Sequence, residues 1–89
     1  MHVFSGRSGS GVELHVYSDH IEVHSAGGKE VLALWYRHIR TLVSSREDGT
    51  EALAIVDRGG QVLLVPLADG QVSAAHWLIS SVMEWAGRS

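Results

Sequence analysis

The sequence predicts an α+β domain in which a run of antiparallel strands is followed by one C-terminal helix. Over residues 12–25 apolar and polar side chains alternate with a period of two, and further strand-like apolar segments, separated by polar or glycine-containing turns, follow up to residue 67. Over residues 71–86 the apolar residues recur at helical spacing instead. We therefore expect an antiparallel sheet or partly open barrel of five to six strands, with an amphipathic helix packed against it.

The N-terminal residues 1–11 are expected to form a flexible segment. Residues 5–11 read Ser-Gly-Arg-Ser-Gly-Ser-Gly, a composition that favours a mobile loop. Residues 1–4 form either a short first strand or part of a loose tail, and the tail is the preferred interpretation. The folded part is then a single domain over residues 12–89.

The clearest element is a hairpin over residues 12–25, in which apolar residues alternate with polar ones on both sides of Ser18 and Asp19. If these two residues form the loop, Val16 faces Ile21. Leu14 then faces Val23, and all four apolar side chains share one face of the sheet. This single consistent register is the reason for predicting the hairpin.

Four further segments are predicted as strands: residues 30–36, 37–45, 51–57 and 61–67, joined by turns at 26–29, 46–50 and 58–60. The first and last of these four are apolar on both faces, so both faces should be covered. Pro66 gives the sheet no backbone donor, which indicates that the last strand lies at an edge or ends there.

The predicted helix has one apolar side. Eight residues share it: Val72, Ala75, Leu78, Ile79, Val82, Met83, Trp85 and Ala86. Trp77 falls outside this side, among serines and Glu84. It is either covered by a loop or the N-terminal segment, or it is an exposed anchor for a partner.

Composition limits the function classes. The chain has 89 residues, 45% hydrophobic and 19% charged, which is typical of one folded domain. It contains no cysteine, so thiol catalysis and cysteine zinc sites are excluded. A net charge of -3 argues against a nucleic-acid partner. No apolar run is long enough for a membrane span, and no secretory signal precedes the domain, so a cytoplasmic location is expected.

Four parts of the chain resemble the pleckstrin-homology-like group, which includes bacterial PH and GRAM domains. They are the strand pair at 12–23, the Leu-Trp-Tyr-Arg-His-Ile step at 34–39, residues 53–60 and the final helix. The resemblance implies a seven-stranded barrel, for which this chain is short, so at least one strand is expected to be missing or supplied by a partner. Members of this group mostly bind proteins or lipid head groups and are rarely enzymes. No spacing of Ser, His and Asp marks a catalytic triad either, so no enzyme is expected.

Two sets of polar residues are candidate sites. Glu13, His15, Glu22 and His24 would share the polar face of the first hairpin, and imidazole with carboxylate is a normal zinc or copper ligand set. A solvated face with weak Glu–His attraction is the preferred interpretation, so no metal and no cofactor are expected.

The basic residues Arg37, His38, Arg40 and Arg46 are the second set. They could hold a phosphate, a lipid head group or an acidic peptide, or they are ordinary solvated side chains. In the resembling domains that bind phosphoinositides, the basic residues surround the first hairpin loop. Here that loop, residues 17–20, reads Tyr-Ser-Asp-His, which counts against a lipid ligand.

The strands that are apolar on both faces predict a partner chain, because one helix can cover only one face of a sheet. We expect a homo-oligomer, with Leu32, Leu34, Tyr36 and Trp77 as partner-binding residues. The function expected from the sequence is a non-enzymatic protein-interaction or scaffold module. The alternative is a phosphate or lipid head-group binding domain that uses Arg37 and Arg40.

Overall fold

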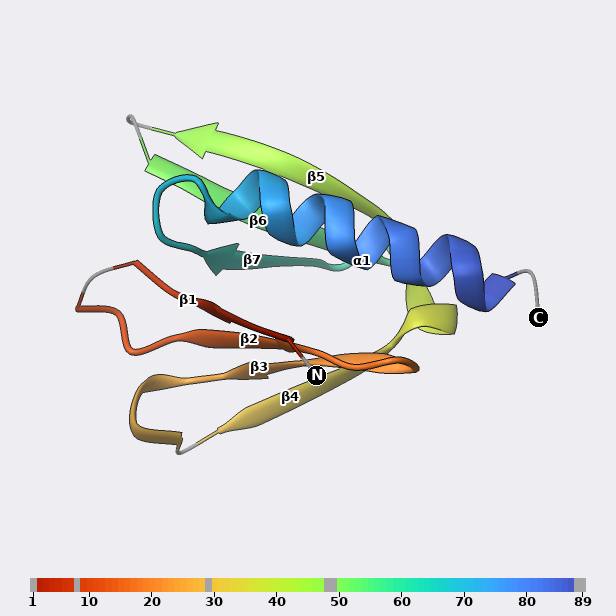
Figure 1. Ribbon diagram of the computed structural model, residues 1–89, viewed down its shortest axis with the longest axis horizontal. Coiled ribbons are helices and arrows are strands. Elements are labelled where there is room, and N and C mark those ends of the chain that lie inside the picture. Colours follow the sequence, from red (N-terminus) through yellow and green to blue (C-terminus); the bar gives the residue numbers. More distant parts are fainter. Residues whose placement is uncertain (1, 8, 29, 48–49, 88–89) are drawn as a thin grey trace.

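The computed structural model describes residues 2–7, 9–28, 30–47 and 50–87, which form two antiparallel sheets followed by one helix (Figure 1). The seven strands are β1 (His2–Ser5), β2 (Glu13–Val16), β3 (His20–His24), β4 (Val31–Trp35), β5 (Ile39–Glu47), β6 (Thr50–Asp57) and β7 (Val62–Pro66). The helix is α1 (Gln71–Gly87). The strand orders are β1-β2-β3-β4 and β5-β6-β7, and the sheets do not close into a barrel. The predicted α+β class is confirmed, with one or two more strands than expected.

The additional strand lies at the N-terminus, where the prediction of a loose tail is wrong for His2–Ser5. This strand pairs antiparallel with β2, and Phe4 lies opposite Leu14. The Phe4 side chain is buried in the core, so its burial stabilises a strand that its four-residue length alone would not predict. The glycine-rich segment serves as the turn, in which Gly11 has a φ of 69° and approaches Ala26 too closely for a side chain.

The first hairpin has the predicted register. Leu14 pairs with Val23 and Val16 with Ile21. Leu14 and Ile21 are fully buried, so the apolar pattern did select the core face. A 3-10 turn, η1 (Ala26–Gly28), then leads to β4, which completes the first sheet.

A second 3-10 turn, η2 (Tyr36–His38), carries the chain from the first sheet into the second. The strands β5, β6 and β7 pair in chain order, so β7 lies at an edge, as Pro66 predicted. The turn predicted at 58–60 is confirmed. The centre of the turn predicted at 46–50 falls on residues 48–49, outside the described residues.

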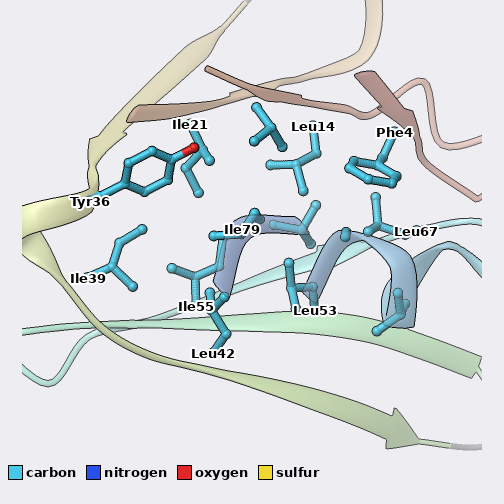
Figure 2. Packing of buried hydrophobic residues seen from close by; sticks show 14 residues of the cluster. Phe4, Leu14, Ile21, Tyr36, Ile39, Leu42, Leu53, Ile55, Leu67 and Ile79 are labelled. Atoms are coloured by element: carbon cyan, nitrogen blue, oxygen red, sulfur yellow. The ribbon is translucent and has the colours of Figure 1, made fainter. Parts of the chain in front are cut away.

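The core lies between the two sheets, and α1 closes one side of it (Figures 1 and 2). The helix contacts β5, β6 and β1, and it buries Val72, Ala75 and Ile79 against them. Trp85 belongs to the apolar side of the helix, yet it is 77% exposed. Trp85 belongs to the last turn of α1, and this end of the helix extends past the ends of the strands (Figure 1). No helix in the described part of the chain has the length and apolar character to cross a membrane.

Candidate functional site

The outer face of β2 and β3, opposite the core, carries a row of paired histidines and carboxylates. His15 Nε2 lies 3.2 Å from a carboxylate oxygen of Glu13. The Glu22 carboxylate bridges two histidines. Its Oε2 lies 2.9 Å from His20 Nε2, and its Oε1 lies 3.0 Å from His24 Nε2. The three imidazoles are between 14% and 23% exposed, so they are mostly covered although they lie on the outside of the sheet.

Aromatic stacking covers these imidazoles. The rings of His15 and His24 stack with centroids 3.8 Å apart. Tyr17 stacks on His20 at 4.6 Å, and Trp35 of the next strand lies 4.9 Å beyond His20. The outer face of the first sheet is therefore an ordered layer of rings and carboxylates.

The charges on this face stabilise one another. Hydrogen bonds that His20 donates to Glu22 and then to Asp19 raise the pKa of His20 above its usual value. The same contacts lower the pKa of the Glu22 carboxyl, with His20 as the largest cause and His24 as the second. The His20 Nδ1 atom lies 2.6 Å from Asp19, so two carboxylates hold opposite sides of one imidazole.

The predicted metal candidates Glu13, His15, Glu22 and His24 do lie together on this face. However, within the described residues, no group of three or more His, Asp or Glu side chains is arranged to hold a metal ion. The stacked rings of His15 and His24 present parallel faces to each other, and their Nε2 atoms bond to carboxylates. The Nδ1 atom of His15 is buried without a hydrogen-bond partner.

The predicted basic cluster does not form one site. Arg37 lies beside the Trp35 ring, with its guanidinium carbon 6.0 Å from the ring centroid. A shallow pocket of about 340 Å³ next to Arg37 also contains Asp19, which would repel an anion. Arg40 lines a different pocket, beside α1. Arg46 lies six residues after Arg40 along β5, which separates the two by roughly 20 Å. Its guanidinium is paired with the Glu51 carboxylate at 3.1 Å.

The four predicted partner-binding residues have different environments. Tyr36 is buried and is not available on the surface, while Leu34 is half-buried against the core. Leu32, Leu34 and Tyr36 all follow the inward side of this part of the chain, because Leu32 lies opposite Val23 and Leu34 opposite Ile21. The sequence could not distinguish this side from the outward one. Leu32 is 47% exposed and Trp77 is 70% exposed. Trp77 lies on the side of α1 opposite the buried Val72, so it faces away from the sheets.

The outer face of the second sheet is a continuous surface without charged side chains. Nine residues in three cross-strand rows share it: Thr41, Val56 and Val62; Val43, Ala54 and Leu64; Ser45, Ala52 and Pro66. None of the nine is charged, and three large members, Val43, Val62 and Leu64, are 48–60% exposed. We call these nine residues the β5–β7 outer face.

Sequence reasoning found only part of this face. It identified residues 61–67 as a strand that is apolar on both faces, and Val62 and Leu64 of that strand lie on this face. It did not place Val43 beside them, although alternation in residues 41–45 and 52–56 carried that signal. The pairing of three strands was needed to show that the rows are continuous.

A groove opens between the two sheets, on the side of β4. It has a volume of about 530 Å³ and is mainly apolar, with these lining residues: Val12, Val23, Ser25, Glu30, Val31, Leu32 and Leu63. The groove follows the outer strand of the first sheet, where Val31 and Leu32 are about half exposed.

Comparison with known proteins gives no relative to compare these sites with. No family model matches the chain, and no curated protein matches it.

Proposed function

We propose that this protein is a non-enzymatic interaction module of pleckstrin-homology-like type that self-associates through an apolar sheet face. The observation that carries the proposal is the β5–β7 outer face, where nine neighbouring residues on three strands include no charge. A solvent-facing side of an antiparallel sheet is normally polar. A surface of this kind on a soluble chain is typical of a protein contact.

A second copy is the occupant that fits this face. The small residues Ala52 and Ala54 lie along the middle strand, between the larger side chains of Val43 and Leu64. Two such faces can pack as sheets about 10 Å apart, related by a two-fold axis. Because the net charge is -3, two chains repel weakly overall, and the charge-free face is where that repulsion is least.

The size of the face sets the expected strength of the contact. The β5–β7 outer face is three strands wide and five residues long, so it measures roughly 14 Å by 17 Å. This is well below the area of about 800 Å² that each partner contributes in a stable complex. The self-association through this face should therefore be weak and reversible.

The resemblance to pleckstrin-homology-like domains remains part of this proposal. The chain has seven strands and a C-terminal helix, so the expectation that at least one strand is missing is wrong, and the two sheets stay open. The protein-binding function common in that group supports an interaction role. The alternative, a phosphate or lipid head-group site at Arg37 and Arg40, is not favoured because the two residues line different pockets. A cytoplasmic location stays a proposal that cell fractionation tests.

The test is the solution mass of the full chain over a range of concentrations. Light scattering between about 1 and 500 μM should give a weight-average mass that rises from 9.6 kDa towards twice that value. A mass of 9.6 kDa at every concentration would overturn the self-association proposal.

A further inference from the structure

The two sheets have four edge strands, β1, β4, β5 and β7, and three of them are protected. The β1 edge is capped, because the Ser5 N–H donates to Gln71 Oε1 at 2.9 Å and the Ser5 carbonyl accepts from Ala68 N–H at 3.1 Å. At the β7 edge, Pro66 has no N–H, and its carbonyl accepts from Arg7 N–H at 3.3 Å.

The β5 edge is protected by other means. Its register is interrupted between Ile39 and Thr41, and the strand carries the charged Arg40 and Arg46. The carbonyl of Leu42 accepts a hydrogen bond of 3.2 Å from His76 of α1. Bulges, charges, proline and covering helices are the usual ways in which proteins prevent edge strands from pairing with another chain.

The β4 edge has none of these features. Its sequence is Val-Leu-Ala-Leu-Trp, without charge, proline or a break in register. In the part of the chain that the structure describes, its backbone makes ladder hydrogen bonds to β3 alone. Val31, Leu32 and Trp35 are 42–52% exposed, so the strand presents apolar side chains on both faces next to a free edge.

We propose that the β4 edge pairs with β4 of a second copy, antiparallel, with Ala33 opposite Ala33 of the second copy. In this register Leu32 meets Leu34 of the second copy, and Val31 meets its Trp35. The small Ala33 side chain allows the two strands to approach on the two-fold axis, where a large residue would meet itself.

Charge at the two ends of the strand favours this occupant. Glu30 precedes β4 and Arg37 follows it, and both are exposed. Because Lys29 adjoins Glu30 in the sequence, an antiparallel copy brings opposite and like charges to Arg37 of the other chain that nearly balance, whereas a parallel copy would place only like charges together. The exposed apolar residues of β4 are thus accounted for by a contact separate from the β5–β7 outer face.

The absence of cysteine makes cross-linking a clean test, because one introduced cysteine is the sole thiol. Residues directly opposite in an antiparallel pair have Cα atoms about 4.5–5.5 Å apart, within the range of a disulfide. The Ala33→Cys variant should therefore form a disulfide-linked dimer under mild oxidation. Ala33 is exposed, so the substitution should leave the melting temperature within a few degrees of wild type.

The matched control is Val31→Cys on the same strand. In the proposed register its two thiols lie roughly 14 Å apart, too far for a disulfide. Ala33→Cys should cross-link at least about tenfold faster than Val31→Cys, because paired strands hold its thiols at high effective concentration. Equal rates for the two variants would overturn the Ala33-centred pairing.

The same measurement in a Leu64→Lys background separates this inference from the proposed function, since Leu64 lies on the β5–β7 outer face. Cross-linking of Ala33→Cys at an unchanged rate supports an independent contact at the β4 edge. Loss of cross-linking in that background would mean that the chains meet through the β5–β7 outer face, and it would overturn the edge contact.

Discussion

The hydroxyl of Tyr36 donates a hydrogen bond to the carbonyl oxygen of Tyr17, nineteen residues earlier in the chain. The backbone N–H of Tyr36 also donates to the Asp19 carbonyl at 3.3 Å. Because Tyr36 begins the 3-10 turn that joins the two sheets, these bonds fix the crossing point to the loop of the first hairpin. Burial, and secondarily the charge of Asp19, raises the pKa of Tyr36 to about 12, so its hydroxyl remains a donor at neutral pH.

Tyr36→Phe should lower the free energy of unfolding by about 1 kcal/mol. The variant keeps the buried ring and loses one hydrogen bond to a partly buried carbonyl. Urea denaturation measures the difference. Tyr17→Phe is the control, since the accepting atom is the backbone carbonyl of Tyr17 and not its side chain. An equal loss in both variants would contradict the assignment.

Leu14→Ala should cost about 2–4 kcal/mol, while His15→Ala should cost less than about 1 kcal/mol. Leu14 is fully buried between the sheets. His15 lies on the outer face, where loss of its ring contacts is offset by removal of an unpartnered Nδ1 atom. Equal costs in denaturant melts would show that the hairpin register is wrong.

Stability should depend on pH through His20 and Glu22. The pKa of His20 is raised from 6.5, so its stabilising contribution is complete below pH 6.5 and is lost as the pH rises through the folded-state value. The pKa of Glu22 is lowered from 4.5, so its contribution is present above pH 4.5 and is lost as the pH falls through its folded-state value. Both contributions are therefore present together between pH 4.5 and 6.5.

His20→Gln tests this pH dependence. The variant should lose less stability than wild type when the pH rises from 6.5 to 8.5, as measured by urea denaturation at each pH. His38→Gln, at an exposed position in η2, is the control and should keep the wild-type slope. The same slope in wild type and His20→Gln would show that His20 makes no pH-dependent contribution.

Removal of metal should leave the protein unchanged. The imidazoles of His15, His20 and His24 already bond to carboxylates, and two of them stack face to face. We expect the same melting temperature with and without a chelator, and no shift after addition of one equivalent of zinc. A higher melting temperature with stoichiometric bound zinc would contradict this view.

The sequence predicted the elements whose apolar pattern is long and regular. The first hairpin is the best example, because Leu14, Val16, Ile21 and Val23 share one face in only one register. For β1 the less favoured of two interpretations, a short first strand, is the correct one. The strand has one inward aromatic residue, Phe4, and its pairing is decided by the core and not by local pattern.

The candidate sites were harder to predict, because they depend on distance along an element. Arg40 and Arg46 are close in sequence, but an extended strand separates them and Glu51 binds the second. The helical position of Trp85 puts it on the apolar side of α1, yet the residue is exposed. A helical wheel gives the side of the helix but does not show where the strands beside it end. Leu34 and Tyr36 were assigned to a partner because a strand apolar on both faces does not reveal which face is inward.

Sedimentation equilibrium of Leu64→Lys tests the central claim, self-association through the β5–β7 outer face, most directly. Leu64 is 54% exposed, so the lysine should not disturb the fold but should place charges against each other in the contact. Ala74→Lys, on the exposed side of α1, is the matched control. We predict that Leu64→Lys weakens self-association at least about tenfold, or about 1.4 kcal/mol, while Ala74→Lys matches wild type. Equal association of all three proteins would contradict the account.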